Sequence, residues 1–256
     1  MIDPFDDLVT SKRPYRVVAC IPVKGRGPLL EQTIKRLYRK NDVFKVICVG
    51  DDAEDRKVCE RAGAVWVQHK NKPLGAKWNA AFQEAKKYEP DACLYVGSSD
   101  WLSDNWIDFI RPHVEAHDLV GVPGMHLVDS SSQGLRLCYW PGYPPEKRQE
   151  SIGIGRMLSR KILQKCRWMP FDNEIDKSLD RSMTQKLGLF GFKEFMLINP
   201  HLMALSLSFP ERWSNKHIFE MHWNNQLPSQ KIEDANLFMN NHFPEIFEIE
   251  YAGIRQ

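Results

Sequence analysis

Apolar and polar positions follow two alternating patterns through the first hundred residues. Continuous apolar runs predict strands at 15–21, 45–50, 64–68 and 92–96. Between these runs, apolar residues recur at helical spacing and predict helices at 28–38, 53–62 and 77–87. Buried strands that alternate with amphipathic helices are typical of a mostly parallel sheet covered by helices on both faces. We therefore expect an α/β fold.

The pattern changes beyond residue 104. It predicts a helix at 105–117 with Asp104 as its N-cap, a strand at 119–123, and a hairpin whose strands are 125–128 and 135–139. Further helices are expected at 159–166 and 176–187. No linker separates the two patterns, so we expect one compact unit with two functional halves, residues 1–120 and residues 121–256.

Composition narrows the class of protein only slightly. The 256 residues are 43% hydrophobic and 27% charged, with a net charge of +2, which neither favours nor excludes nucleic acid as a partner. None of the six cysteines forms a C-x-x-C pair, and three of them fall in predicted strands. The acidic start of the chain has no signal-peptide pattern, and no apolar run approaches a membrane span. We expect reduced cysteines and a cytoplasmic protein.

Polar side chains follow three of the predicted strands. Lys24 and Arg26 follow the first strand, Asp51 and Asp52 the second, and Asp100 the fourth. In open parallel sheets, ligands bind at the carboxyl ends of the strands, so these side chains are expected to converge. A carboxylate such as Asp100 can bind Mg²⁺ or Mn²⁺, which in turn neutralises a diphosphate. The alternative for Asp100 is an ordinary turn or helix-cap residue.

Two common nucleotide motifs are missing. The segment after the first strand, 25–30, lacks the third glycine of a dinucleotide-binding loop, and the chain contains no Walker A sequence. His113 and His117 are four residues apart on a predicted helix but lack the carboxylate of a zinc-protease motif.

Three segments together resemble glycosyltransferases of the GT-A fold, close to the family-2 type. The first strand ends in Pro22-Val23-Lys24-Gly25-Arg26, and the segment 72–81 resembles the family's Asn-x-Gly-x-x-x-Asn-x-(Ala/Gly) pattern. Ser98-Ser99-Asp100 stands where the family has its Asp-x-Asp metal motif, and it keeps only the last carboxylate. The resemblance covers residues 15–110 well. It implies a Rossmann-like, mostly parallel sheet in which residues 1–120 bind a nucleotide sugar and residues 121–256 form the acceptor-side, catalytic half.

The resemblance also implies roles for individual residues. Asp100 would bind Mn²⁺ or Mg²⁺, with His217, or else His222, completing the metal shell. The catalytic base is expected at a helix start, with Asp180 preferred and Asp176 or Asp172 in reserve. The residues expected to hold the donor are Pro22, Lys24, Arg26, Asp51, Asp52, Gly75, Lys77, Asn79, Ser98 and Ser99.

The activity that this resemblance implies is sugar transfer with inversion, from a nucleotide-diphosphate sugar, expected to be a UDP-sugar, to an acceptor hydroxyl. Such chains resemble bacterial or phage-encoded enzymes, whose acceptors are glycans, proteins or, in some phages, modified DNA bases in the host cytoplasm. Two alternatives stay open: a sugar-nucleotide nucleotidyltransferase and a non-catalytic binding module of the same fold. The aromatic residues that could stack on a sugar or a base, or belong to the core, are Trp140, Tyr143, Trp213 and Trp223.

Overall fold

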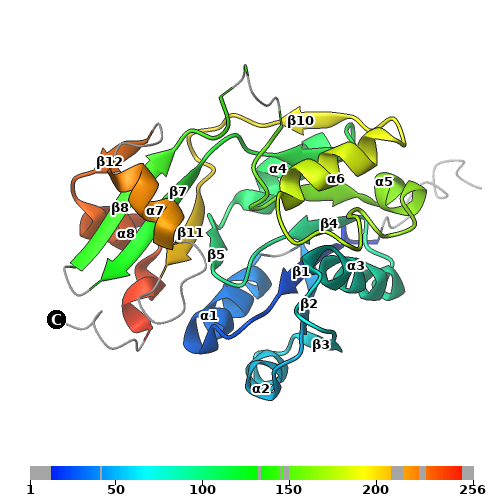
Figure 1. Ribbon diagram of the computed structural model, residues 1–256, viewed down its shortest axis with the longest axis horizontal. Helices are drawn as coiled ribbons and strands as arrows, with labels where there is room; N and C mark the ends of the chain where they lie inside the picture. The colour runs from blue at the N-terminus through cyan, green and yellow to red at the C-terminus, as the bar shows by residue number, and fades with distance from the viewer. Residues whose placement is uncertain are drawn as a thin grey trace, which may run out of the picture.

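The main structural element is a seven-stranded sheet in which one strand runs against the others (Figure 1). The computed structural model describes residues 13–40, 42–131, 134–144, 146, 150–208, 216–224 and 229–249. In spatial order the strands are β10 (Glu194–Met196), β6 (Leu119–Gly121), β9 (Met157–Ser159), β4 (Ala92–Tyr95), β1 (Val17–Pro22), β2 (Val43–Gly50) and β3 (Val65–Gln68). Only β9 is antiparallel to its neighbours, β4 and β6. The predicted mostly parallel sheet is confirmed.

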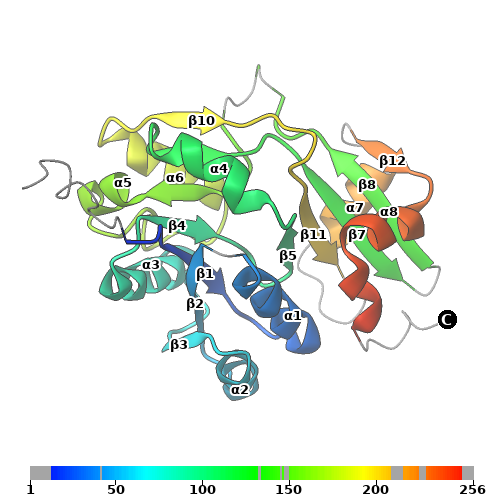
Figure 2. The ribbon, with the colours of Figure 1, turned by 180° about the vertical axis from the view of Figure 1, so that it is seen from behind.

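Helices cover both faces of this sheet because each helix buries one apolar stripe against it. One face packs against α1 (Gly27–Tyr38), α2 (Ala53–Arg61) and α4 (Trp106–Val114). The other face packs against α3 (Leu74–Ala85), α5 (Arg160–Lys165) and α6 (Leu179–Gly188), and α3 continues into a short 3₁₀ turn, η1 (Lys86–Tyr88). Figure 2 shows α4 and α1 from the side on which they lie.

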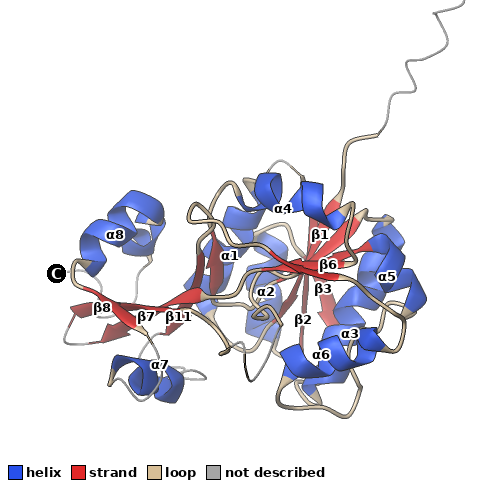
Figure 3. Ribbon diagram, turned by 90° about the horizontal axis from the view of Figure 1, so that it is seen from above, coloured by secondary structure: helices blue, strands red, loops and turns tan. Residues whose placement is uncertain are grey.

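A second, five-stranded sheet lies beside the first. Its order is β12 (Gln230–Ile232), β8 (Gly134–Trp140), β7 (Met125–Ser131), β11 (Ala204–Ser208) and β5 (Asp100–Leu102). The predicted hairpin is the β7–β8 pair. Helices α7 (Lys216–Trp223) and α8 (Ala235–His242) pack on opposite faces of this sheet (Figure 3), and a 3₁₀ turn, η2 (Pro244–Glu248), follows α8.

The chain crosses between the two sheets more than once. Strand β5 follows β4 after a short turn but pairs with β11 in the second sheet. After the β7–β8 hairpin the chain returns to the main sheet for β9, α5, α6 and β10, and only then completes the second sheet. Residues 121–256 therefore contribute to both sheets, and the segment from β9 to β10 belongs to the main sheet and its helices.

One predicted cap is wrong. Asp104 does not cap α4: the residue before the helix is Asn105, whose side chain makes no capping bond. The Asp104 carboxylate instead accepts a hydrogen bond from Arg36 of α1 at 3.0 Å. Arg36 is buried, and a buried guanidinium requires nearby acceptors, so this long-range pairing prevails over the local cap.

Helices in the described ranges are all too short or too polar to cross a membrane.

Candidate functional site

A cavity of about 650 Å³ opens at the carboxyl ends of β1 and β2. It contains seven of the ten residues that the sequence predicted to hold the donor: Pro22, Lys24, Arg26, Asp51, Asp52, Lys77 and Ser98. The remaining wall is formed by Gly25, Asn71, Lys72 and Leu74. The main sheet therefore brings together residues that are up to 76 positions apart in sequence, at the edge where open parallel sheets bind ligands.

Lys77 is the buried cation of this cavity. It belongs to the first turns of α3, and only 1% of its surface is exposed. Its ammonium group donates to the side-chain oxygen of Asn71 at 2.6 Å and to the backbone oxygen of Val23. Burial lowers the pKa of Lys77 to about 8, although the negative charges of Asp51 and Asp55 oppose the shift. An anion bound in the cavity would raise the pKa of Lys77 again and so favour its charged form.

The two neighbouring carboxylates after β2, Asp51 and Asp52, have different hydrogen-bond partners. Asp52 caps α2 and accepts from the backbone N–H groups of Glu54 at 2.8 Å and Asp55 at 3.1 Å. Asp51 is exposed and accepts from the backbone and the side chain of Asn71. Asp52 therefore stabilises the start of α2, whereas Asp51 holds Asn71 in the wall of the cavity.

Asp55 is a site residue that the sequence analysis missed. It is 4% exposed, and its carboxylate accepts from the backbone N–H of Gly25 at 2.5 Å, which fixes the loop that carries Lys24 and Arg26. The sequence offers only a weak signal for this role, because an acidic residue in the first turn of a helix is expected for the helix dipole alone.

Gly75 and Asn79 lie beneath the cavity and do not line it. The amide of Asn79 donates to Phe171 O and Asn173 Oδ1, both at 2.8 Å, and accepts from Phe171 N at 3.1 Å. Gly75 lets the same loop approach α3, because a Cβ at this position would overlap the backbone oxygen of Asp172. Both residues hold the 171–175 loop against the start of α3.

Asp100 is the first residue of β5, and its carboxylate is fixed by short contacts. Its Oδ2 accepts from the backbone N–H of Gly97 at 2.9 Å, and it also bonds the side chain of Ser206 on β11. Burial raises the pKa of Asp100 to about 6, while these hydrogen bonds and the nearby Arg26 guanidinium oppose the shift. Ser99 lies beside it, buried, with its backbone oxygen accepting from Leu207 N at 2.9 Å.

The donor set around Asp100 fits a metal only if the substrate supplies ligands. In the described part of the chain, no three His, Cys, Asp or Glu side chains gather so that they could hold an ion. Mg²⁺ is commonly bound by one or two carboxylates, with phosphate oxygens and water completing its shell, and Asp100 suits this arrangement. His222 is buried and its Nδ1 lies 2.9 Å from Ser229 Oγ. The His217 side chain, like Trp213, lies outside the described residues.

Asp180 stands in the first turn of α6, across from Asp100. Its Oδ2 accepts from the backbone N–H of Gly153 at 3.0 Å and from the hydroxyl of Tyr143 at 3.3 Å. No described residue donates to its Oδ1, and the side chain is only partly buried. The charge of Asp180 contributes to the raised pKa of Asp100, which shows that the two carboxylates are close enough to interact.

The two reserve candidates have other partners. Asp176 accepts from the backbone N–H of Leu74 at 2.9 Å and lies 4.0 Å from Lys72 Nζ, so it caps the start of α3. Asp172 is exposed and lies 3.9 Å from Lys186 Nζ. Helix α6 begins at Leu179, three residues after the predicted start, because Ser178 before it has a left-handed backbone conformation with a φ of +52°.

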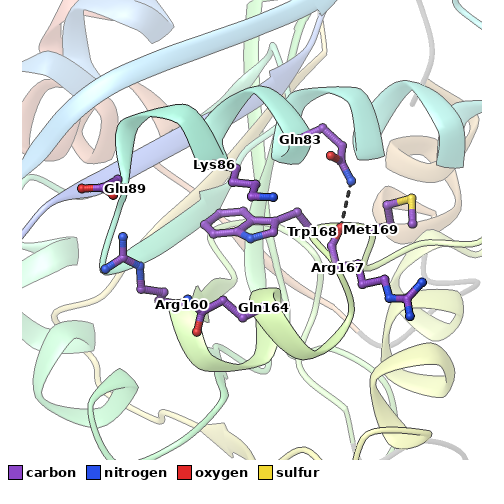
Figure 4. A pocket seen from close by; sticks show the side chains of 8 residues that line it. All are labelled: Gln83, Lys86, Glu89, Arg160, Gln164, Arg167, Trp168 and Met169. Atoms are coloured by element: carbon purple, nitrogen blue, oxygen red, sulfur yellow. Dashed lines mark hydrogen bonds between the residues drawn. The ribbon is translucent and has the colours of Figure 1, made fainter.

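A second cavity, of about 570 Å³, lies at the opposite end of α3 (Figure 4). The figure shows Trp168 and Gln164 on one side and Lys86 of η1 on the other, with Gln83 donating to the backbone oxygen of Arg167. None of the residues predicted from the sequence lines this cavity. Its lining residues are Gln83, Lys86, Glu89, Arg160, Gln164, Arg167, Trp168 and Met169. The candidate site is therefore the cavity at the carboxyl ends of β1 and β2.

The overall fold is similar to that of a solved enzyme structure. PcManGT, a mannosyltransferase from Pyrobaculum calidifontis in complex with GDP-Man and Mn²⁺, superposes with a TM-score of 0.53 at 12% identity, over 80% of this chain and 60% of that one. The fold is of the GT-A type.

Two other structures match with lower TM-scores. Staphylococcus aureus TarS, residues 1–349, gives a TM-score of 0.48 at 15% identity over 81% of this chain and 63% of that one. A 4-diphosphocytidyl-2C-methyl-D-erythritol synthase from Anaerococcus prevotii gives 0.47 at 12% identity, over 83% and 97%. This chain spans about 60% of the length of PcManGT and of TarS. No protein-family model matches the sequence, and no curated protein matches it.

Proposed function

We propose that the protein is a glycosyltransferase that moves a sugar from a nucleotide-diphosphate sugar to an acceptor hydroxyl. The observation that carries the proposal is a cavity lined by basic side chains together with a carboxylate, Asp180, that has one oxygen without a hydrogen-bond donor among the described residues. Lys24, Arg26 and Lys77 line the cavity, and Asp180 lies across from Asp100 with one oxygen accepting no hydrogen bond from the described residues. The GT-A fold supports this reading, since the similar PcManGT structure holds GDP-Man.

The donor would lie in the cavity with its nucleoside toward Asp51 and its diphosphate toward the cations. Lys77 and Arg26 would balance the charge that develops on the departing diphosphate. The closely packed residues behind them, Gly75 and Asn79, keep the start of α3 in place. We expect a UDP-sugar as the donor.

A divalent ion, Mn²⁺ or Mg²⁺, would bind at Asp100 together with the diphosphate of the donor. When bound, it would supply positive charge that stabilises the leaving group. The similar PcManGT structure contains Mn²⁺, which supports a metal-dependent reaction. Asp100 is suited to this role because it is held by Gly97 and Ser206 and partly withdrawn from water.

Asp180 would act as the base. The acceptor oxygen attacks the anomeric carbon, the bond between that carbon and the diphosphate oxygen breaks, and the diphosphate leaves with the electron pair. The acceptor proton passes to Oδ1 of Asp180, the oxygen that accepts no hydrogen bond from the described residues. A single displacement of this kind inverts the configuration of the sugar.

The proposal also covers the acceptor and the cellular location of the protein. A glycan, a protein or a modified DNA base would each present a hydroxyl, and Trp140 and Tyr143 lie on the acceptor side near Asp180. The cytoplasmic location, in a bacterium or a phage-infected host, stays a prediction from the cysteine content.

A donor screen tests the proposal directly. Purified protein is incubated with Mn²⁺ and UDP-, GDP- and dTDP-sugars, and mass spectrometry follows the release of the nucleoside diphosphate. Turnover of one donor supports the proposal. Release of pyrophosphate from a nucleoside triphosphate would indicate a nucleotidyltransferase instead, and tight donor binding without turnover would indicate a binding module.

Two substitutions test the assigned roles. Asp180→Asn removes the base and should lower the transfer rate by about 10²- to 10⁴-fold, while Asp100→Ala should abolish metal-dependent transfer. Both variants should keep the wild-type far-ultraviolet circular dichroism spectrum. Asp172→Asn is the matched control, because this exposed carboxylate lies outside the site, and its rate should equal that of the wild type. A fully active Asp180→Asn enzyme would remove Asp180 from the mechanism.

A further inference from the structure

The carboxylate of Asp180 is held asymmetrically. Both hydrogen bonds that its side chain accepts from the described residues reach one oxygen, Oδ2, and come from the Gly153 N–H and the Tyr143 hydroxyl. The backbone of Asp180 is fixed separately, because the buried Arg156 donates to its carbonyl oxygen at 3.1 Å. The orientation of the carboxyl group therefore depends on these two donors, while the position of the residue does not.

The two donors come from different parts of the fold. Gly153 precedes β9 in the main sheet, and its lack of a side chain is required, because a Cβ there would overlap Asp180 Oδ1 and press on the ring of Tyr95. Tyr143 follows β8 of the second sheet. The loop that carries it is fixed by Gly142, whose φ of +99° and close approach to the backbone of Pro123 both exclude a side chain.

The Tyr143 ring has its own packing partner. It meets the Trp140 ring edge-on with the centroids 5.1 Å apart, so the ring stays in place without help from the hydroxyl. A hydroxyl that donates to Oδ2 restricts rotation of the Asp180 carboxylate, and a base misplaced by about 1 Å can slow a reaction by about 10²-fold.

We propose that Tyr143 is a positioning residue that fixes the rotation of the Asp180 carboxylate for its reaction with the acceptor hydroxyl. The inference rests on the proposed role of Asp180 as the base and adds to it a residue from the second sheet. It places the second sheet in direct contact with the reaction, through one hydroxyl, in addition to any part that it has in holding the acceptor.

The test compares kcat and KM in Tyr143→Phe, which keeps the ring and removes only the hydroxyl. With the donor that the screen identifies, and Mn²⁺, kcat for transfer should fall about tenfold, the effect of one lost hydrogen bond in the transition state. The KM for the donor should stay within about twofold of wild type. Tyr38→Phe is the matched control, since its hydroxyl bonds Gly63 O on the far side of α1, and its kcat should not change.

A double variant separates positioning from structure. If Tyr143 acts through Asp180, Tyr143→Phe should cause no further loss of kcat in the Asp180→Asn background. Equal kcat in wild type and Tyr143→Phe, or the same fractional loss in both backgrounds, would overturn the positioning role and leave the glycosyltransferase proposal intact. A wild-type protein that turns over no donor would overturn the proposed function, and this inference with it.

Discussion

At the scale of single residues, the proposed metal ligand Asp100 lowers the stability of the fold when its carboxylate is ionised. It is held by Gly97 and Ser206, yet burial raises its pKa from 3.8 to about 6. The folded state therefore binds a proton more tightly than the unfolded state does. Ionisation of Asp100 weakens folding as the pH rises from about 4 to 6, and the cost is fully present above that window.

Asp100→Asn should consequently stabilise the free protein at neutral pH. The gain is at most about 3 kcal/mol at pH 7.5, since each pKa unit corresponds to about 1.4 kcal/mol, and it should shrink as the pH falls below 6. Urea unfolding at pH 7.5 and pH 4.5 measures the difference between variant and wild type. Asp51→Asn, at an exposed carboxylate, is the control. A difference that is the same at both pH values would contradict the assigned cause.

At the scale of elements, the start of α3 depends on a loop that is a hundred residues away. The Leu74 N–H is satisfied by Asp176, Gly75 N donates to Ile175 O at 2.8 Å, and Asn79 bonds the backbone of Phe171. The first turn of α3 and the 171–176 segment therefore form one packed unit behind the donor cavity.

Gly75→Ala should disrupt this unit. A Cβ at residue 75 overlaps the backbone oxygen of Asp172, which cannot rotate away as a flexible side chain could. We expect a loss of about 1–3 kcal/mol in the free energy of unfolding, and weaker donor binding because Lys72 and Lys77 lie on the same segment. Gly188→Ala in α6, where a Cβ meets nothing within 4 Å, should be neutral or slightly stabilising. Thermal unfolding of both variants gives the comparison.

Local sequence signals predicted the elements of the first half and the convergence of their polar ends. Apolar runs mark β1, β2 and β4 because strands buried on both faces need apolar side chains on both sides, whereas β3 at the edge of the sheet is only partly buried. The contacts of Asp180 with Tyr143, 37 residues away, and of Asp176 with Leu74, 102 residues away, carry no such signal. They depend on how the chain crosses between sheets, as does the pairing of β5 with β11, which no periodicity encodes.

At the scale of the whole molecule, a charged cluster joins the two sheets. Arg36 of α1, 2% exposed, donates to Glu245 of η2 at 2.6 Å, to Asp104 at 3.0 Å and to the backbone oxygen of Leu102 at 3.2 Å. Glu245 also contacts Arg39 at 2.5 Å. The 3₁₀ turn at the end of the second sheet is thereby fixed to a helix of the main sheet.

Glu245→Gln should weaken this connection because it leaves Arg36 buried with less compensating charge. We expect a loss of about 3 kcal/mol in the free energy of unfolding, measured by urea denaturation. Glu60→Gln, which removes an exposed partner of Arg56, should leave the unfolding midpoint unchanged. If the two variants had equal midpoints, the cluster would not contribute to joining the sheets.

The contact between Asp176 and the start of α3 also bears on the distance between the cavity and Asp180. Asp176 touches the wall of the donor cavity through Leu74, and four residues later the same segment carries Asp180. This short segment, packed on the main sheet, therefore fixes the distance between the cavity wall and the proposed base, Asp180.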